Sequence, residues 1–144
     1  MARLILITEG KLDSQIIGFL LNTGDNKLFM VDGGGYNRIS SLIRTLYLMY
    51  GDEYYYLAVF DSDSDSPSIQ AERLSIVKQL SGASMHEDRI GVFCFQNNIE
   101  SELLLPKNFK DDMSSLKDYL SKNKTSLQET KTIKDIQRFI ERIR

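Results

Sequence analysis

The segment YYYLAVFDSDSD, residues 54–65, joins two contrasting kinds of sequence. Its first part, Tyr54 to Phe60, is rich in aromatic and aliphatic residues and has the high β propensity of a strand. Its second part places carboxylates at alternate positions, at Asp61, Asp63 and Asp65. Because alternate residues of an extended segment point the same way, we expect these carboxylates to share one face.

Strand and helix patterns alternate on both sides of this segment, through residue 105. Three further apolar runs of strand length lie at residues 3–8, 27–31 and 90–95. Apolar residues recur with helical spacing at residues 12–21, 42–50 and 69–80. Because parallel strands need crossover connections, this order predicts an α/β fold with a parallel four-stranded sheet and helices on both faces. We expect the first and third strands to be neighbours.

The last part of the chain has a different, more polar pattern. Residues 108–122 and 131–143 predict two amphipathic helices, and polar residues 123–130 predict a loop between them. We therefore expect an α/β domain at residues 1–106 and a helical extension at residues 107–144 that packs on the same domain.

Charge is distributed unevenly between these two parts. Residues 1–106 contain 8 Lys/Arg against 14 Asp/Glu, whereas residues 107–144 contain 10 against 6. The basic extension fits a phosphate-binding surface, and it fits a solvated helical face equally well. Both interpretations stay open.

Cysteine usage and hydropathy bear on the compartment. The single cysteine, Cys94, cannot form an internal disulfide, which favours a reducing compartment. The apolar stretch Leu4 to Ile7 is too short for a signal peptide, and no run approaches the roughly 20 apolar residues needed to cross a bilayer. We therefore expect a cytoplasmic protein without a membrane partner.

Ligands of parallel α/β sheets bind beyond the carboxyl ends of the strands. Each predicted strand is followed there by an acidic or glycine-rich segment, namely Glu9, Asp32 to Gly35, Asp61 to Asp65, and Asn97 to Glu102. Carboxylates that lie close together repel each other unless a cation or a proton neutralises them. Oxygen ligands of this kind suit Mg²⁺ or Mn²⁺. The pattern therefore predicts a divalent-metal site at one edge of the sheet.

Two alternatives exist for the acidic run alone. It could be a solvated acidic loop, or it could be a calcium loop of the EF-hand type. Four acids match spaced positions of such a loop, namely Asp61, Asp63, Asp65 and Glu72. However, Ser66 stands where the loop needs Gly, and a Tyr-rich strand rather than a helix precedes the run.

Two motifs resemble those of the Toprim family. Residues 7–13 (ITEGKLD) resemble its first motif, and residues 59–65 (VFDSDSD) resemble its DxD motif with a third acid. The resemblance covers roughly residues 3–105 and implies a Toprim-like, Rossmann-like fold. The first motif is most similar to that of primases and of the maturase of 5S ribosomal RNA. Residues 98–103 (NIESEL) instead resemble the late acidic motif of overcoming-lysogenization-defect nucleases.

The resemblance implies a set of metal ligands. Asp61, Asp63 and Asp65 would hold Mg²⁺ or Mn²⁺. Glu100 would be a ligand of a second metal, with Glu102 as the alternate choice. For both glutamates, exposed charges at the start of a helix are an equally simple explanation.

The first motif supplies the remaining predicted roles. Glu9 would be a general acid or base, or a metal ligand through water. Gly10 and Lys11 would contact the phosphate of the substrate. Asp13 would support the ligands or pair with Lys11.

The expected chemistry is metal-assisted phosphoryl transfer on nucleic acid, DNA or RNA. A nuclease is the simplest form, because 144 residues leave no room for the further domains that topoisomerases and primases use. One alternative is a non-catalytic module that binds nucleic acid or a protein partner, including a second copy of itself. Another is a receiver-like phospho-acceptor at Asp61, although Thr8-Glu9 and the missing fifth strand argue against it.

Overall fold

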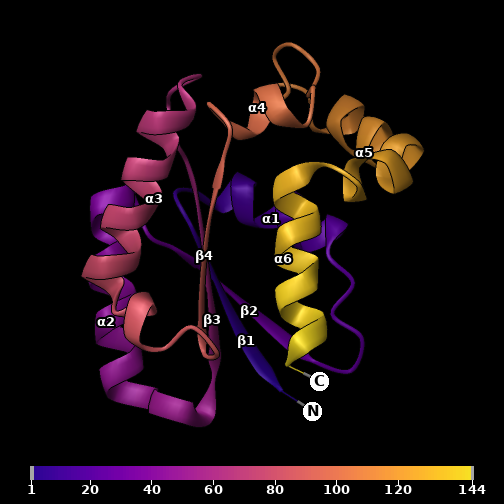
Figure 1. Cartoon of the computed structure of the whole chain (residues 1–144). Helices are drawn as coiled ribbons and strands as arrows, with labels where there is room; N and C mark the ends of the chain where they lie inside the picture. Colours follow the sequence, from indigo (N-terminus) through magenta and orange to yellow (C-terminus); the bar gives the residue numbers. More distant parts are fainter. Residues whose placement is uncertain (1, 144) are drawn as a thin grey trace.

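The computed structural model describes residues 2–143 (Figure 1). The strands are β1 (Arg3–Thr8), β2 (Lys27–Asp32), β3 (Tyr55–Asp61) and β4 (Ile90–Phe95). The helices are α1 (Lys11–Leu20), α2 (Tyr36–Tyr50), α3 (Pro67–Ser81), α4 (Ile99–Glu102), α5 (Met113–Gln128) and α6 (Lys131–Arg142). Two short 3₁₀ turns, η1 (Gly51–Glu53) and η2 (Ala83–Met85), follow α2 and α3. No helix within residues 2–143 has the length and apolar character needed to cross a membrane.

The four strands form one parallel sheet in the order β2-β1-β3-β4. This confirms the predicted fold class and the predicted contact between the first and third strands. The register pairs Ile7 of β1 with Ala58 of β3, so β3 extends two residues further than β1 at the carboxyl end of the sheet. Glu9, which follows β1, and Asp61, the last residue of β3, are therefore brought to the same end of the sheet.

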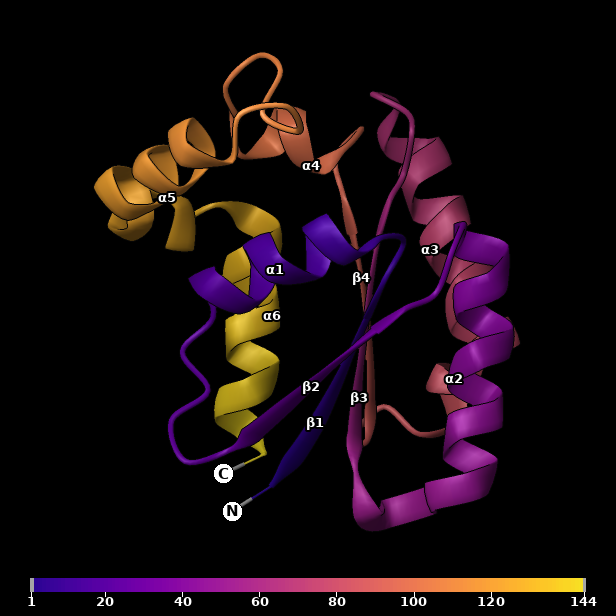
Figure 2. The same ribbon diagram turned by 180° about the vertical axis from the view of Figure 1, so that it is seen from behind.

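Helices cover both faces of the sheet (Figures 1 and 2). Alternation along β1 sends Leu4 and Leu6 into a core shared with α1, α5 and α6, and sends Ile5 and Ile7 into a core shared with α2 and α3. The C-terminal helices thus complete one face of the sheet, because the buried face of α6 packs on β4.

The predicted boundaries of the first C-terminal helix are wrong. Helix α5 begins at Met113, where Asp112 accepts a hydrogen bond from the Ser115 backbone N–H at 3.0 Å. It continues to Gln128, through the stretch predicted as a loop. Two local features explain this: buried Leu127 lies two turns after buried Leu120, and the Asn123 amide donates to the backbone of its own helix.

Gly33 occupies the turn between β2 and α2, where the chain passes close to β1. A Cβ at Gly33 would lie 2.8 Å from Ile39 Cγ1 and 3.0 Å from Ile7 Cγ2. Replacing Gly33 with alanine should therefore reduce the free energy of unfolding by about 1–3 kcal/mol through overpacking. Urea denaturation measures this loss.

Gly35 provides the matched control for this substitution. A Cβ at Gly35 would meet no atom within 4 Å, and Gly35 caps α2 with ordinary negative φ. Gly35→Ala should cost less than about 1 kcal/mol, the loss of a glycine cap. A smaller loss at Gly33 than at Gly35 would contradict the close packing of this turn.

Candidate functional site

A hydrogen bond joins the ends of β1 and β3. The Asp61 backbone N–H donates to Glu9 Oε1 at 2.6 Å. Glu9 lies in the tight connection to α1, where the Thr8 hydroxyl donates to the Gly10 carbonyl at 2.7 Å. The carboxylate of Glu9 is therefore held over the end of the third strand, which is where the acidic run begins.

A second hydrogen bond adds the segment after β4. The Ile99 backbone N–H, at the start of α4, donates to Asp61 Oδ1 at 2.9 Å. Asn98 caps α4 by accepting from the Ser101 N–H at 2.8 Å. Because Glu100 directly follows Ile99, its carboxylate is brought to the same edge as Glu9 and Asp61.

The acidic run turns sharply after Ser62. Asp63 has a left-handed backbone, with φ of 55°, and its N–H donates to the Asn97 carbonyl at 2.7 Å. The side chain of Ser62 is fully buried and accepts from the Asn97 N–H at 3.0 Å. The expectation of an extended segment with all three aspartates on one face is therefore wrong beyond Ser62, since these bonds fold the run against the loop after β4.

Helix α3 holds the same run from the other side. Gln70 Nε2 donates to the Ser64 carbonyl at 2.7 Å. The guanidinium of Arg73 donates to the carbonyl of Ser62. The backbone between Asp61 and Ser64 is thus fixed by side chains of α3 as well as by the loop after β4.

Among the acids at this edge, the carboxyl group of Asp61 has the most strongly shifted pKa. Burial, and after it the nearby carboxylates of Glu9 and Asp13, raise the pKa of the Asp61 carboxyl to about 8, although the hydrogen bond from the Ile99 N–H acts to lower it. Burial also raises the pKa of Glu9, with further contributions from Asp63, Asp13 and Glu100. These acids share an electrostatic environment that disfavours several negative charges at once.

Asp13 belongs to this group, although its sequence pattern assigned it only a supporting role. It lies in the first turn of α1, four residues after Glu9, and is partly buried. Burial raises the pKa of Asp13, Glu100 raises it further, and Lys110 lowers it. The position of Asp13 four residues after Glu9 was the feature of the sequence that could have identified it as a member of this group. We call Glu9, Asp13, Asp61, Asp63 and Glu100 the acidic cluster.

The other predicted site residues lie differently. Asp65 is exposed and is not among the main causes of the raised pKa values of Glu9, Asp13 and Asp61. Glu102 points to α6, where it accepts from the Thr132 N–H at 3.1 Å and the Thr132 hydroxyl at 2.8 Å. Of the two alternative glutamates, Glu100 therefore joins the acidic cluster and Glu102 anchors α6.

Gly10 and Lys11 lie at the entrance to α1. A Cβ at Gly10 would meet no atom within 4 Å, so there is open space beside this backbone. Lys11 is exposed. Neither residue is engaged in a way that would prevent contact with a ligand approaching the acidic cluster.

The donor chemistry of the acidic cluster fits a hard divalent cation, since all its side-chain donors are carboxylate oxygens. These carboxylates repel one another, and a bound cation would neutralise that repulsion. Within residues 2–143, however, no three His, Cys, Asp or Glu side chains converge closely enough to form a ready metal site.

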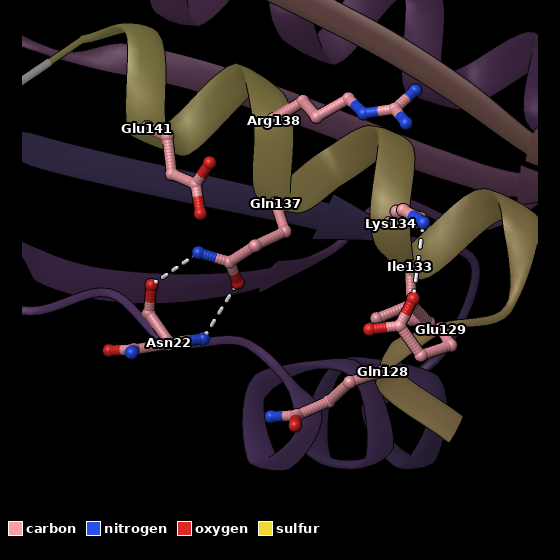
Figure 3. A pocket seen from close by; sticks show the side chains of 8 residues that line it. All are labelled: Asn22, Gln128, Glu129, Ile133, Lys134, Gln137, Arg138 and Glu141. Atoms are coloured by element: carbon pink, nitrogen blue, oxygen red, sulfur yellow. Dashed lines mark hydrogen bonds and ion pairs between the residues drawn. The ribbon is translucent and has the colours of Figure 1, made fainter. Parts of the chain in front are cut away.

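A separate pocket of about 340 Å³ lies between the α1–β2 loop and α6 (Figure 3). Its polar groups bind one another: the Asn22 N–H donates to Gln137 Oε1 at 2.9 Å, and Gln137 Nε2 donates back to the Asn22 carbonyl at 2.8 Å. Lys134 pairs with Glu129 at 3.1 Å. These contacts tie the loop to the C-terminal helices, and they lie apart from the acidic cluster.

A comparison of the chain with protein families, with curated proteins and with solved structures finds no match. The resemblance to the Toprim family therefore stays a prediction that rests on the quoted motifs.

Proposed function

We propose that this chain is a divalent-metal-dependent enzyme that cleaves phosphodiester bonds of nucleic acid, with DNA or RNA as substrate. The observation that carries the proposal is the pair of hydrogen bonds through Asp61. They gather acids from the ends of β1 and β3 and from α4 at one edge of the sheet. The raised pKa of Asp61, caused by burial and by its acidic neighbours, marks this edge as a place where a cation is favoured.

Three residues are the best candidates to hold Mg²⁺ or Mn²⁺. Asp61 is the last residue of β3, Asp63 lies in the run that follows it, and Glu100 comes from α4. A bound ion would stabilise negative charge on the phosphate and lower the pKa of a bound water. Asp65 has no part in this proposal, because it is not among the main causes of the raised pKa values of Glu9, Asp13 and Asp61, whereas Asp63 raises the pKa of Glu9.

Glu9 is the proposed general acid or base. One of its oxygens is held by the Asp61 N–H, so the carboxyl group has a fixed orientation and its other oxygen can exchange a proton. Burial raises its pKa toward the working pH, which is the direction that suits proton transfer.

The substrate phosphate would approach beside Gly10 and Lys11. The open space at Gly10 admits a phosphate, and the exposed ammonium of Lys11 supplies an opposite charge. Lys110, whose charge already lowers the pKa of Asp13, would bring the basic extension to the same place. We place this activity in the cytoplasm, where the free thiol of Cys94 would stay reduced.

The test is incubation of the protein with labelled DNA and RNA in Mg²⁺, Mn²⁺ or EDTA. We expect cleavage of at least one substrate with a divalent ion, and loss of cleavage in EDTA and in Asp61→Ala. The matched control is Asp118→Ala, which removes an exposed carboxylate of α5 that pairs only with Lys122 among the contacts described. Wild-type protein that cleaves neither substrate with either ion would contradict the proposal.

A non-catalytic binding module is the second candidate. The observation in its favour is that the carboxylates within residues 2–143 do not already converge on one point. In that case nucleic acid should bind through the basic extension, with an affinity that falls with salt and is unchanged by EDTA.

A further inference from the structure

The outer strands of the sheet are β2 and β4, and their open edges differ in how far other parts of the chain cover them. At β4 the Ile90 N–H donates to the His86 carbonyl at 2.8 Å, and the Gln96 N–H just beyond the strand donates to Glu102 at 3.0 Å. The Thr132 hydroxyl lies 3.2 Å from the Cys94 carbonyl. Side chains of α3 and α6 form the walls of a groove along this edge. Edges of sheets are commonly protected in this way.

No described part of the chain, residues 2–143, protects the edge of β2 in this way. The Lys27 N–H donates to the Ala2 carbonyl at 3.0 Å, and the Gly33 N–H donates to the Thr8 carbonyl at 2.6 Å. Odd-numbered residues of β2 therefore direct their backbone groups to β1. By alternation, the N–H and C=O groups of Leu28, Met30 and Asp32 point away from the sheet. Figure 2 looks onto this edge, and no part of the described chain lies in front of it.

Large apolar side chains are exposed on both faces of the same strand. Phe29 is 44% exposed on the face of α2, where its ring lies 5.9 Å from that of Tyr54. Met30 is 48% exposed on the face of α1, where its methyl group lies against Gly18 beside exposed Phe19. No charge or proline interrupts the strand between Lys27 and Asp32. An unpaired, apolar edge of this kind is a template for another strand.

We propose that β2 is a dimer interface, and that it pairs antiparallel with β2 of a second copy of this chain about a two-fold axis at Met30. In this register Met30 lies opposite Met30 of the second copy, and Leu28 lies opposite Asp32. Every outward N–H and C=O of these three residues then has a partner. The free groups of the edge are thus complementary to themselves, as an isologous interface requires.

The side chains favour the same register. On the face of α2, Phe29 lies opposite Val31 of the second copy in a non-hydrogen-bonded pair, where side chains are closest. Aromatic and β-branched residues stabilise such cross-strand pairs. On the face of α1, the two Met30 side chains meet. Lys27 lies opposite Gly33, so no like charges face each other.

A second copy covers this edge more completely than a single extended peptide would. A two-fold axis perpendicular to the sheet keeps each face on its own side, so α1 meets α1 and α2 meets α2. Exposed Phe19 of α1 and exposed Tyr50 of α2 then lie near the same junction as Met30 and Phe29. The ring of Tyr50 is already linked to Phe29 through Tyr54, at 5.4 and 5.9 Å.

Sedimentation over a concentration series tests the proposal. Wild type should be a dimer, and Met30→Lys should move the monomer–dimer midpoint to at least about tenfold higher protein concentration, because two like charges then face each other. Met85→Lys is the matched control, since Met85 is 84% exposed at η2, away from β2. Circular dichroism and melting temperature confirm that each variant folds.

Cross-linking tests the register. In a Cys94→Ser background, Met30→Cys places two thiols on a directly opposed pair with Cα atoms about 5.5 Å apart, within the range of a disulfide. Asp32→Cys is the control on the same edge, because its two copies would be separated by on the order of 14 Å along the strands. We expect mild oxidation to cross-link Met30→Cys and not Asp32→Cys.

Three results would overturn the proposal. Wild type could remain a monomer at every concentration, the dimer could persist unchanged in Met30→Lys, or Asp32→Cys could cross-link in preference to Met30→Cys. None of the substituted residues belongs to the acidic cluster, so these outcomes do not depend on metal binding or cleavage.

Discussion

Replacing Glu9 with glutamine should reduce cleavage of nucleic acid by about 10²–10⁴-fold, the usual contribution of a positioned acid or base. Glutamine keeps an oxygen that can accept the 2.6 Å hydrogen bond from the Asp61 N–H, so the link between β1 and β3 should survive. It removes the titratable group. Single-turnover cleavage rates in Mn²⁺ and Mg²⁺ measure the effect.

The affinity of Glu9→Gln for Mn²⁺ distinguishes a role of Glu9 in proton transfer from a role as a metal ligand. Because Asp61, Asp63 and Glu100 are the proposed ligands, Mn²⁺ should bind Glu9→Gln with nearly wild-type affinity. Loss of Mn²⁺ binding would make Glu9 a direct ligand and contradict its role in proton transfer. Rescue of cleavage in Glu9→Asp, at a lower rate, would support that role.

Replacing Asp61 with asparagine should stabilise the metal-free protein at pH 8. Burial and neighbouring carboxylates raise the pKa of Asp61 from 3.8 to about 8 in the folded chain. Between these values the folded state holds a proton that the unfolded state has lost, so stability falls as pH rises from about 4 to 8. Each pKa unit corresponds to about 1.4 kcal/mol. Screening by solvent reduces the total, and we expect a gain on the order of 2–3 kcal/mol for Asp61→Asn.

Urea denaturation in EDTA at pH 5 and pH 8 measures this gain. Asparagine keeps Oδ1 as the acceptor for the Ile99 N–H, so α4 should stay in place. The difference between wild type and variant should be larger at pH 8 than at pH 5. Asp118→Asn, at an exposed position, should show no such pH-dependent gain. A variant that is less stable than wild type at pH 8 would contradict the repulsion inferred at this edge.

The order of elements in the sheet could be predicted because each segment has a clear period. Apolar runs such as Ile90 to Phe95 and amphipathic stretches such as residues 69–80 follow one another with turn residues between them. The limits of α5 could not be predicted, because Asn123 looks like a loop residue in sequence. Its amide in fact donates to the Tyr119 carbonyl within the helix.

The site could be predicted only in part. Strand-end placement correctly indicated that Glu9 and Asp61 meet, since that follows from a parallel sheet. The direction of side chains depended on tertiary contacts that the sequence does not display. The left-handed turn at Asp63 needs the carbonyl of Asn97, and the capture of Glu102 needs Thr132 of α6. The pKa of Asp13 likewise depends on residues far away in the sequence, since Glu100 raises it and Lys110 lowers it.

The most direct measurement of the central claim is calorimetric titration with Mn²⁺ at pH 7, in two buffers that differ in their enthalpy of ionisation. Ligand carboxylates must lose their protons when a metal binds. Because the pKa of Asp61 is raised to about 8 by burial and by Glu9 and Asp13, we predict binding with release of about one proton per ion. Both the binding and the proton release should be lost in Asp61→Asn/Asp63→Asn. An absence of binding to wild type, or equal binding and equal proton release in the double variant, would contradict a metal site at the acidic cluster.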